Sequence, residues 1–297
     1  SNLNWTDVSS WNTGSCDGTP ATSYPGEYDS VFIGCNGWNG YTLVVNSNIS
    51  CRGIKIDLQG RININDGVTL TVNSNLLIGK TTDWSNGQGL INIGNGHLVV
   101  NGDLILGWNN DTHGIQWTNG DITVTGNLIC SDGGNFDNRT EDGTNESNKP
   151  GGETPTYAGY IIMSGANKNI QVDYPIDLVR LKINSSTITK NGSANLYISG
   201  DLDLNNQSAF TSSAGIIQLN GTLSNSSSCI ITVSGGIFKD YSSTNSPTIA
   251  GLILTNGASF TLGNSSALTL NITGNFSGSG TFNMTNANHT LNLGGET

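Results

Sequence analysis

The stretch Val100-Asn101-Gly102-Asp103-Leu104 returns as Val124-Thr125-Gly126-Asn127-Leu128, with the same order of apolar and small polar residues. Each copy has an apolar residue, a variable residue, Gly or Ser, a small polar residue, and then Leu or Phe. The chain holds four further copies, at Val72–Leu76, Ile198–Leu202, Leu219–Leu223 and Ile272–Phe276. Successive copies start 28, 24, 74, 21 and 53 residues apart, close to one, one, three, one and two units. A loose period of 21–28 residues indicates a repeat architecture with one β-helix coil per unit.

Between these copies every second residue is apolar and the residues between are mostly polar, which predicts short strands with one buried face. Gly and Asn separate the strands and tolerate the positive φ of tight corners. We therefore predict an all-β fold, a right-handed parallel β-helix (solenoid) with about three strands per coil. A β-sandwich also uses short strands and turns, but the coil-length repeat favours the helix. Clear examples of the alternation are Ile54-Lys55-Ile56, Ile62-Asn63-Ile64, Leu70-Thr71-Val72 and Phe260-Thr261-Leu262.

The first 50 residues depart from this rule, whereas residues 51–297 follow it. Because an open β-helix end is an unpaired sheet edge, we expect residues 1–50 to form an N-terminal cap and the first strands. A carbohydrate-stacking platform is the alternative for the aromatic residues there. At the other end, Leu291-Asn292-Leu293 reads as an ordinary strand, so we expect the rod to continue in a longer polypeptide or in another subunit. The segment 1–50 contains Trp5, Trp11, Tyr24, Tyr28, Trp38 and Tyr41.

Residues 131–160 form one long break without alternation, which predicts an acidic insertion loop between coils. Long insertions in compact repeats are often functional, and carboxylate oxygens are the ligands that calcium prefers. A calcium site is therefore one hypothesis for this loop, although its spacing matches no EF-hand. A solvated acidic loop without a cofactor is the alternative. The candidate calcium ligands are Asp132, Asp137, Glu141 and Asp142.

The charge of the chain limits its partners. Lys and Arg number 11 in 297 residues and the formal net charge is −11, so no basic stripe can neutralise a row of phosphates. No apolar run approaches the ~18 residues that a membrane span needs. We therefore expect no nucleic-acid partner and no membrane span. The chain begins at Ser1, and we expect a secreted form from which a signal peptide was removed, or else a cloned fragment.

The five cysteines divide into two groups. Three of them, Cys16, Cys35 and Cys51, predict one disulfide near the N-terminus, and both Cys16–Cys35 and Cys35–Cys51 are open as pairings. Cys130 and Cys229 lie in apolar strand-like runs, where a small buried hydrophobic residue is expected.

Catalytic motifs are hard to find in this sequence. A hydrolase on a β-helix needs paired carboxylates at a working separation, and a lyase needs an acidic cluster beside a basic residue. Neither arrangement occurs within a predicted strand, so a non-catalytic protein is favoured over an enzyme. A carbohydrate-binding or polysaccharide-degrading protein is the alternative, and it requires exposed aromatic residues. The candidates for contact with sugars are Trp84, Trp108 and Trp117.

Many Asn-x-Ser/Thr sequons occur, and a chain this rich in Asn, Ser and Thr produces many by chance. The motif marks accessible acceptor sites, and modification depends on the host. The candidates for glycosylation are Asn138, Asn145, Asn184, Asn191, Asn225 and Asn264.

The opening phrases Asn4–Asn12 and Pro25–Ile33 resemble a recurring start of large β-helical secreted proteins of Bacteroidetes-type bacteria. In those proteins a Trp-containing turn leads to a strand and then to β-helix coils. The phrases Gly126-Asn127-Leu128 and Gly280-Thr281-Phe282 are similar to their coils. The resemblance implies an adhesin, a surface-layer protein or a filament component, and it carries no catalytic motif.

Fold and resemblance together predict an extracellular structural or adhesive protein at the cell surface, such as a stalk or filament segment. Its expected partners are glycans or other copies of itself, and its only possible cofactor is calcium. A receptor binder similar to a phage tail spike is a third hypothesis, which trimerisation would support.

Overall fold

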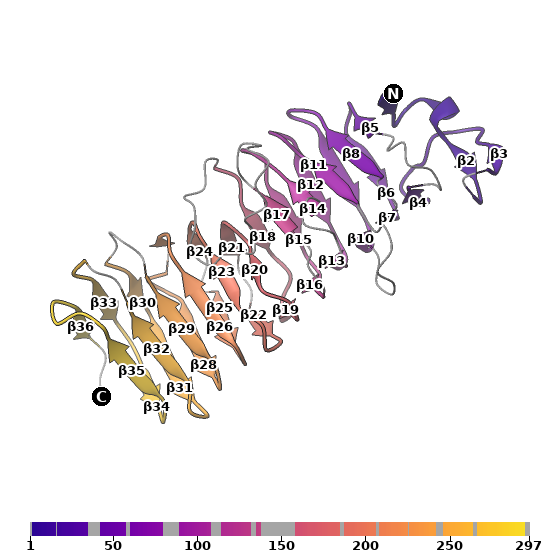
Figure 1. Cartoon of the computed structure of the whole chain (residues 1–297). Coiled ribbons are helices and arrows are strands. Elements are labelled where there is room, and N and C mark those ends of the chain that lie inside the picture. The colour runs from indigo at the N-terminus through magenta and orange to yellow at the C-terminus, as the bar shows by residue number, and fades with distance from the viewer. Residues whose placement is uncertain are drawn as a thin grey trace. The chain divides into compact units, whose positions relative to one another are not determined.

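In the computed structural model the described part of the chain is built of short strands joined by turns (Figure 1). The described residues are 2–15, 17–34, 42–57, 60–79, 89–107, 114–131, 135–137, 158–184, 187–205, 208–224, 226–241, 246–263 and 266–294. They divide into two compact units. The first comprises the described residues up to 137 together with residues 158–160, and the second comprises those from 161 to 294.

The described residues of the first unit form seventeen strands and one short 3-10 helix, η1 (Val8–Ser10). The strands are β1 (Asn2–Asn4), β2 (Asn12–Thr13), β3 (Thr19–Pro20), β4 (Ser30–Ile33), β5 (Thr42–Val45), β6 (Ile49–Cys51), β7 (Gly53–Ile56), β8 (Arg61–Ile64), β9 (Thr69–Val72), β10 (Leu76–Ile78), β11 (Leu90–Asn92), β12 (His97–Val100), β13 (Leu104–Leu106), β14 (Gly114–Gln116), β15 (Ile122–Val124), β16 (Leu128–Cys130) and β17 (Asn135–Asp137).

In the second unit, strands are the only regular secondary structure among the described residues. They are β18 (Ile161–Met163), β19 (Lys168–Val172), β20 (Ile176–Asp177), β21 (Leu181–Asn184), β22 (Thr187–Asn191), β23 (Leu196–Ile198), β24 (Leu202–Asn205), β25 (Ala209–Ser212), β26 (Ile216–Leu219), β27 (Leu223–Ser224), β28 (Ile230–Ser234), β29 (Ile237–Asp240), β30 (Thr248–Ile249), β31 (Gly251–Thr255), β32 (Ser259–Leu262), β33 (Thr269–Ile272), β34 (Phe276–Gly278), β35 (Thr281–Met284) and β36 (Thr290–Leu293).

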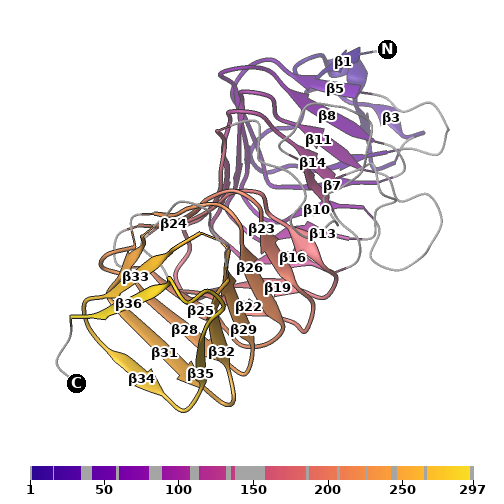
Figure 2. The same ribbon diagram turned by 60° about the vertical axis from the view of Figure 1, so that its left-hand side comes forward.

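Apart from β1, which pairs with β5, and the antiparallel pair β2–β3, strands three apart in the chain pair in parallel. Each unit is therefore a β-solenoid with three strands per coil (Figure 2). In the first unit the sheets run β1-β5-β8-β11-β14-β17, β6-β9-β12-β15 and β4-β7-β10-β13-β16. In the second they run β18-β21-β24-β27, β19-β22-β25-β28-β31-β34, β20-β23-β26-β29-β32-β35 and β30-β33-β36. The predicted all-β parallel solenoid is thereby confirmed. The right hand of the coil stays a prediction.

The interior is built from columns of apolar side chains, one from each coil. The register of β7, β10, β13 and β16 aligns Ile54, Leu76, Leu104 and Leu128, and none of the four is more than 3% exposed. In the second unit the rings of Phe238, Phe260 and Phe282 stack with centroids 5.1 and 5.6 Å apart. Full burial of one such side chain contributes about 1.5–3 kcal/mol, so the columns dominate the stability of each coil.

The recurring glycines stand where turns of successive coils touch. A Cβ on Gly102 would lie 2.5 Å from the Ser74 carbonyl carbon, and a Cβ on Gly126 would lie 2.2 Å from the Gly102 oxygen. The same relationship joins Gly221 to Gly200, at 2.1 Å. Only a residue without a side chain fits such a contact, which explains the glycine at these three copies of the repeated phrase.

Around residues 5–25, aromatic side chains pack on the first strands. The Trp5 ring is fully buried, and its Nε1–H donates to the Pro25 oxygen at 3.1 Å. Trp11 packs edge-on against Trp5 with ring centroids 5.1 Å apart, and its Nε1–H donates to the Trp5 oxygen at 2.7 Å. This packing agrees with the structural interpretation of these aromatics, while their role as a cap stays a prediction.

One part of the predicted insertion is a strand. Asn135–Asp137 form β17, whose backbone pairs with Gly114–Gln116 of β14 in parallel. The prediction of an unbroken loop over 131–160 is therefore wrong at these three residues. A backbone can extend a sheet without apolar alternation in its own sequence, because the ladder bonds come from main-chain groups. The rest of the insertion lies mostly outside the described residues.

Candidate functional site

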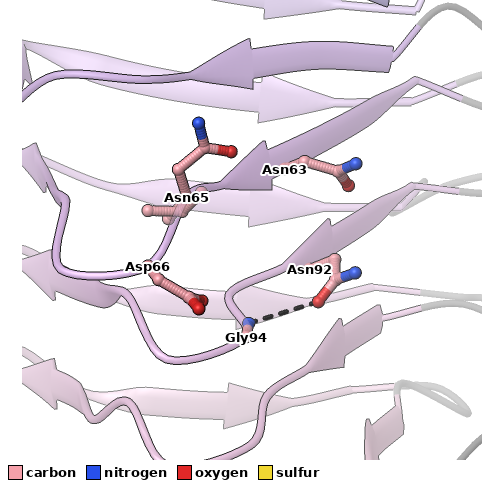
Figure 3. Close-up of a pocket in the computed structure, with 6 residues that line it drawn as sticks. Asn63, Asn65, Asp66, Asn92 and Gly94 are labelled. Atoms are coloured by element: carbon pink, nitrogen blue, oxygen red, sulfur yellow. Dashed lines mark hydrogen bonds between the residues drawn. The ribbon is translucent and has the colours of Figure 1, made fainter.

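An open depression of about 510 Å³ lies over β8 and β11 of the first unit (Figure 3). Its polar lining comes from two successive coils, because Asn63 of β8 is in register with Asn92 of β11. Both amides project from the outward face of their strands, since the alternation buries Ile62 and Ile91. The lining residues are Asn63, Ile64, Asn65, Asp66, Asn92 and Gly94.

The turns beside these strands place Asp66 against Gly94. Gly94 has φ +54, and its N–H donates to Asn92 Oδ1 at 3.2 Å. A Cβ on Gly94 would lie 3.2 Å from Asp66 Oδ1, so the turn leaves room for this carboxylate. The sequence therefore builds this edge of the depression with a glycine in the left-handed region.

Asp66 is a fixed acceptor. Its Oδ1 accepts the Asn95 N–H at 3.1 Å and its Oδ2 accepts the Asn95 amide at 3.0 Å. These bonds, the side-chain one first, lower the pKa of the Asp66 carboxyl below its ordinary value. A proton donor needs the opposite shift, and Asp66 is the only carboxylate among the six lining residues. Asp66 therefore suits accepting hydrogen bonds from a polar ligand better than donating a proton to it.

Asn95 carries the network one coil further. Its Oδ1 accepts hydrogen bonds from Thr118 Oγ1 and from the Asn119 amide, each at 2.9 Å. The Asn119 Oδ1 in turn accepts the Ala158 N–H at 3.2 Å. Polar side chains of successive turns are thus linked along the edge of the first unit.

A second depression, of about 480 Å³, lies over β4, β7, β10 and β13 of the same unit. One of its two cations already has partners, because Lys55 Nζ lies 5.5 Å from the Phe32 ring centroid and 3.6 Å from Asp57 Oδ2. This arrangement offers a mixed apolar and polar surface without an exposed acidic cluster among its lining residues. They are Ser30, Val31, Arg52, Gly53, Ile54, Lys55, Ser74, Asn75, Leu77 and Ile105.

The second unit hides a buried cation that the sequence analysis missed. Lys190 occupies an inward position of β22 and is fully buried. Its Nζ donates to the carbonyl oxygens of Gly192, Ala194 and Ala214, at 2.7, 2.7 and 2.6 Å. Burial lowers the pKa of this ammonium to about 8, and the charge of Asp173 opposes the shift. The alternation Ile188-Thr189-Lys190 was the available signal, since it places Lys190 on the face of Ile188.

The predicted aromatic contacts to sugars are not supported where they can be examined. Trp117 is 1% exposed, so it offers no ring face to a ligand, and this prediction is wrong. Its side chain points inward because it lies two residues after the buried Ile115. Trp84 and Trp108 lie outside the described residues.

The calcium hypothesis stays a prediction. Asp132, Glu141 and Asp142 lie outside the described residues, and of Asp137 the structure describes the backbone, as the end of β17. Among the residues that the structure describes, no three His, Cys, Asp or Glu side chains form a group that could hold a metal.

The disulfide prediction is wrong for one pairing. Cys51 is a free, buried thiol at the end of β6, which contradicts a Cys35–Cys51 bond. Burial, with a smaller contribution from Asp29, raises the pKa of the Cys51 thiol to about 12. Cys16 and Cys35 lie outside the described residues. Cys130 and Cys229 are buried, as their apolar neighbours predicted.

Two glycosylation candidates can be placed. Asn184 ends β21 and Asn191 ends β22, where the Asn191 amide donates to Asn169 Oδ1 at 2.9 Å. Modification of either residue stays a prediction. Asn138, Asn145, Asn225 and Asn264 lie outside the described residues.

Fold and site define a parallel β-solenoid protein with polar, open depressions on its outer face. No protein-family model, curated protein or solved structure matches the chain. In the part of the chain that is described, no helix is long and apolar enough to cross a membrane.

Proposed function

We propose that the chain is a non-catalytic extracellular protein of the cell surface with a structural or adhesive role, as in a stalk or filament segment. The observation that carries this proposal is the use of the recurring polar residues. Asn75 Oδ1 accepts the N–H of Asp103, and Asp103 Oδ1 accepts the N–H of Asn127, at 2.9 and 2.7 Å. The most repeated polar side chains of the sequence therefore hold coils together, a structural task.

The outer faces support the adhesive part of the proposal. Amide side chains at equivalent positions of successive coils bond to one another, as in Asn101 with Asn73 at 3.2 Å and Asn292 with Asn271 at 2.8 Å. In these two places the same amide group thus recurs on neighbouring coils, about one strand spacing of 4.8 Å apart. Weak contacts to a repeating polymer add up over such an array. The resemblance to secreted surface proteins of Bacteroidetes-type bacteria supports an extracellular location.

The proposal is tested by incubating the purified chain with a panel of cell-surface and plant polysaccharides. Retention on one or more polymers, or on whole cells, without new reducing ends is the expected result. Release of reducing ends above that of a heat-unfolded sample would replace the proposal with a polysaccharide-degrading activity.

The depression beside Asp66 favours a second candidate, a carbohydrate-binding protein. Asn63 and Asn92 present amide groups from adjacent strands, and amides pair with sugar hydroxyls as both donors and acceptors. A glycan array compares the unmodified chain with Asn63→Ala, and with Asn48→Ala as a matched control. Asn48 lies in the same unit but outside the lining, and its Oδ1 accepts the Thr69 N–H at 2.9 Å. Loss of binding in Asn63→Ala alone supports this candidate, and equal binding in all three chains contradicts it.

A further inference from the structure

A missing side chain opens the depression over β4, β7, β10 and β13. Gly53 holds an outward position of β7, in register with Ser30 of β4. Its φ is not positive, and the nearest atom to an added Cβ would be the Asn75 carbonyl oxygen, 3.4 Å away. Unlike Gly102 and Gly126, Gly53 is therefore not required by a close contact between turns. Its effect is to leave an open space between the side chains of neighbouring coils.

One wall of this depression is apolar. The outward residues Lys55, Leu77 and Ile105 are in register on β7, β10 and β13, which lie side by side in Figure 2. The Lys55 ammonium already has Asp57 and the Phe32 ring as partners. Leu77 and Ile105 are half-buried, and both line the depression. The wall therefore offers these two side chains to an apolar surface of a ligand, such as the C–H face of a sugar ring.

The other cation of the depression is Arg52, an exposed side chain. No carboxylate among the described residues forms an ion pair with it. The Asp29 backbone oxygen accepts the Arg52 N–H at 2.9 Å, but the Asp29 carboxylate accepts the Gly26 N–H at 2.9 Å. None of the ten residues that line the depression is acidic. Because a guanidinium binds a carboxylate through two parallel hydrogen bonds, Arg52 is suited to an anionic group of a ligand.

Uncharged hydrogen-bonding groups lie in the same lining. Asn75 Oδ1 accepts the Asp103 N–H at 2.9 Å, whereas the Asn75 amide nitrogen donates to no described residue. The hydroxyls of Ser30 and Ser74 also have no partner in the described part of the chain. An amide nitrogen donates, and a hydroxyl both donates and accepts, so these groups can pair with sugar hydroxyls. A cation, an apolar wall and hydroxyl-binding groups thus meet in one depression of about 480 Å³.

We propose that this depression binds a polysaccharide that carries isolated carboxylates, such as the uronic acid units of a mostly neutral glycan. The carboxylate pairs with Arg52, and the C–H face of the ring lies on Leu77 and Ile105. Ring hydroxyls bond to Ser74 and Asn75. The inference rests on the proposed adhesive function and names the class of ligand for it.

The charge of the whole chain favours sparse carboxylates over dense ones. With a formal net charge of −11, the chain repels a polymer that carries a carboxylate on every unit. The Arg52 guanidinium can match one carboxylate at a time. A glycan with neutral units between its carboxylates is therefore favoured over a polyanion, and the open depression lets such a polymer continue on both sides.

The test is affinity electrophoresis of the full chain in gels that contain glucuronoxylan, a neutral backbone with single glucuronate side units. A second set of gels contains the same polymer after its carboxylates are reduced to alcohols. The variants are Arg52→Gln and Gly53→Val, with Arg61→Gln as the matched control. Arg61 is exposed on β8 of the same unit, outside the lining. Circular dichroism confirms that each variant is folded.

Glucuronoxylan is expected to retard the unmodified chain and Arg61→Gln equally. Arg52→Gln loses the cation and Gly53→Val fills the open space, so each raises the dissociation constant at least about tenfold. Reduction of the polymer weakens its binding to the unmodified chain by a similar factor, because the carboxylate is gone.

Four outcomes overturn the inference. These are no retardation of the unmodified chain by glucuronoxylan, equal retardation by the two polymers, equal weakening by Arg52→Gln and Arg61→Gln, or unchanged binding in Gly53→Val. In each case the chain can still be retained by other polymers or by whole cells, which tests the proposed function separately.

Discussion

The side-chain Oδ1 of Asn75 accepts a hydrogen bond of 2.9 Å from the backbone N–H of Asp103, which holds the same place one coil later. Asp103 repeats the contact to Asn127, accepting its N–H at 2.7 Å and its amide at 3.0 Å through one oxygen. In the second unit Asp201 Oδ1 accepts the Thr222 N–H at 3.2 Å. In these three copies of the repeated phrase, the small polar residue is thus an acceptor for the next turn.

Removing one acceptor of this ladder weakens the first unit. Asp103→Ala loses two accepted hydrogen bonds to a charged group, so the free energy of unfolding falls by about 2 kcal/mol. Asp103→Asn keeps an acceptor oxygen and loses less than half as much. Urea unfolding followed by circular dichroism measures both. Equal losses in the two variants would contradict a role for the acceptor.

A methyl group added between stacked turns lowers the stability of the first unit more than the loss of an acceptor does. Gly126→Ala places a Cβ 2.2 Å from the Gly102 oxygen, so the turns must separate at a cost of about 3 kcal/mol. The control is Gly53→Ala, where the nearest atom, the Asn75 oxygen, lies 3.4 Å from the new Cβ. Thermal unfolding distinguishes them, and similar melting temperatures for both variants would show that the turns are not in close contact.

The buried ammonium ties two successive turns of the second unit. Lys190→Met leaves the oxygens of Gly192, Ala194 and Ala214 without this donor, and the unfolding free energy falls by about 3 kcal/mol or more. Lys190→Arg tests whether another cationic side chain can hold the two turns together. Unfolding with urea gives the differences, and a Lys190→Met variant as stable as the unmodified chain would contradict the clamp.

The same lysine makes stability depend on alkaline pH. Its pKa is about 8 in the folded chain and near 10.5 in the unfolded chain, so between these values the unfolded chain binds more protons. Stability relative to Lys190→Met therefore rises as the pH increases from 8 to 10.5. Unfolding free energies of both chains at pH 7, 9 and 10 measure this difference. A constant or falling difference would show that the lysine is not buried as described.

Cys51 provides a chemical test of the first unit. A buried thiol with a pKa of about 12 holds almost no thiolate at neutral pH, so iodoacetamide leaves it unmodified until the chain is unfolded. Mass spectrometry before and after unfolding measures the labelling. Rapid labelling of Cys51 in the folded chain, or its recovery in a disulfide, would contradict the structure.

Periodicity predicted the fold well because the solenoid repeats the same physics in each coil. The alternation around Ile54 and Leu70 describes buried columns, and Gly126 marks a stacked turn. The strand β17 was missed because three residues, Asn135-Phe136-Asp137, are too few to show an alternation.

The candidate site was predicted less well. The chemistry of a residue was given more weight than its inward or outward place in the alternation of a strand. Trp117 and Lys190 each lie two residues after a buried isoleucine, so the alternation places both inward. Their chemistry suggested an exposed ring and a solvated charge. The depression beside Asp66 depends on which turns stack, and Asn63 and Asn92 are 29 residues apart in the chain. Their register cannot be obtained from spacing alone.

Surface labelling tests the central claim most directly. An antibody raised against the purified chain is applied to intact and to permeabilised cells that produce the protein. The account predicts equal labelling in the two samples, because the proposed function places the chain outside the cell. Labelling that appears only after permeabilisation would contradict an extracellular structural or adhesive role.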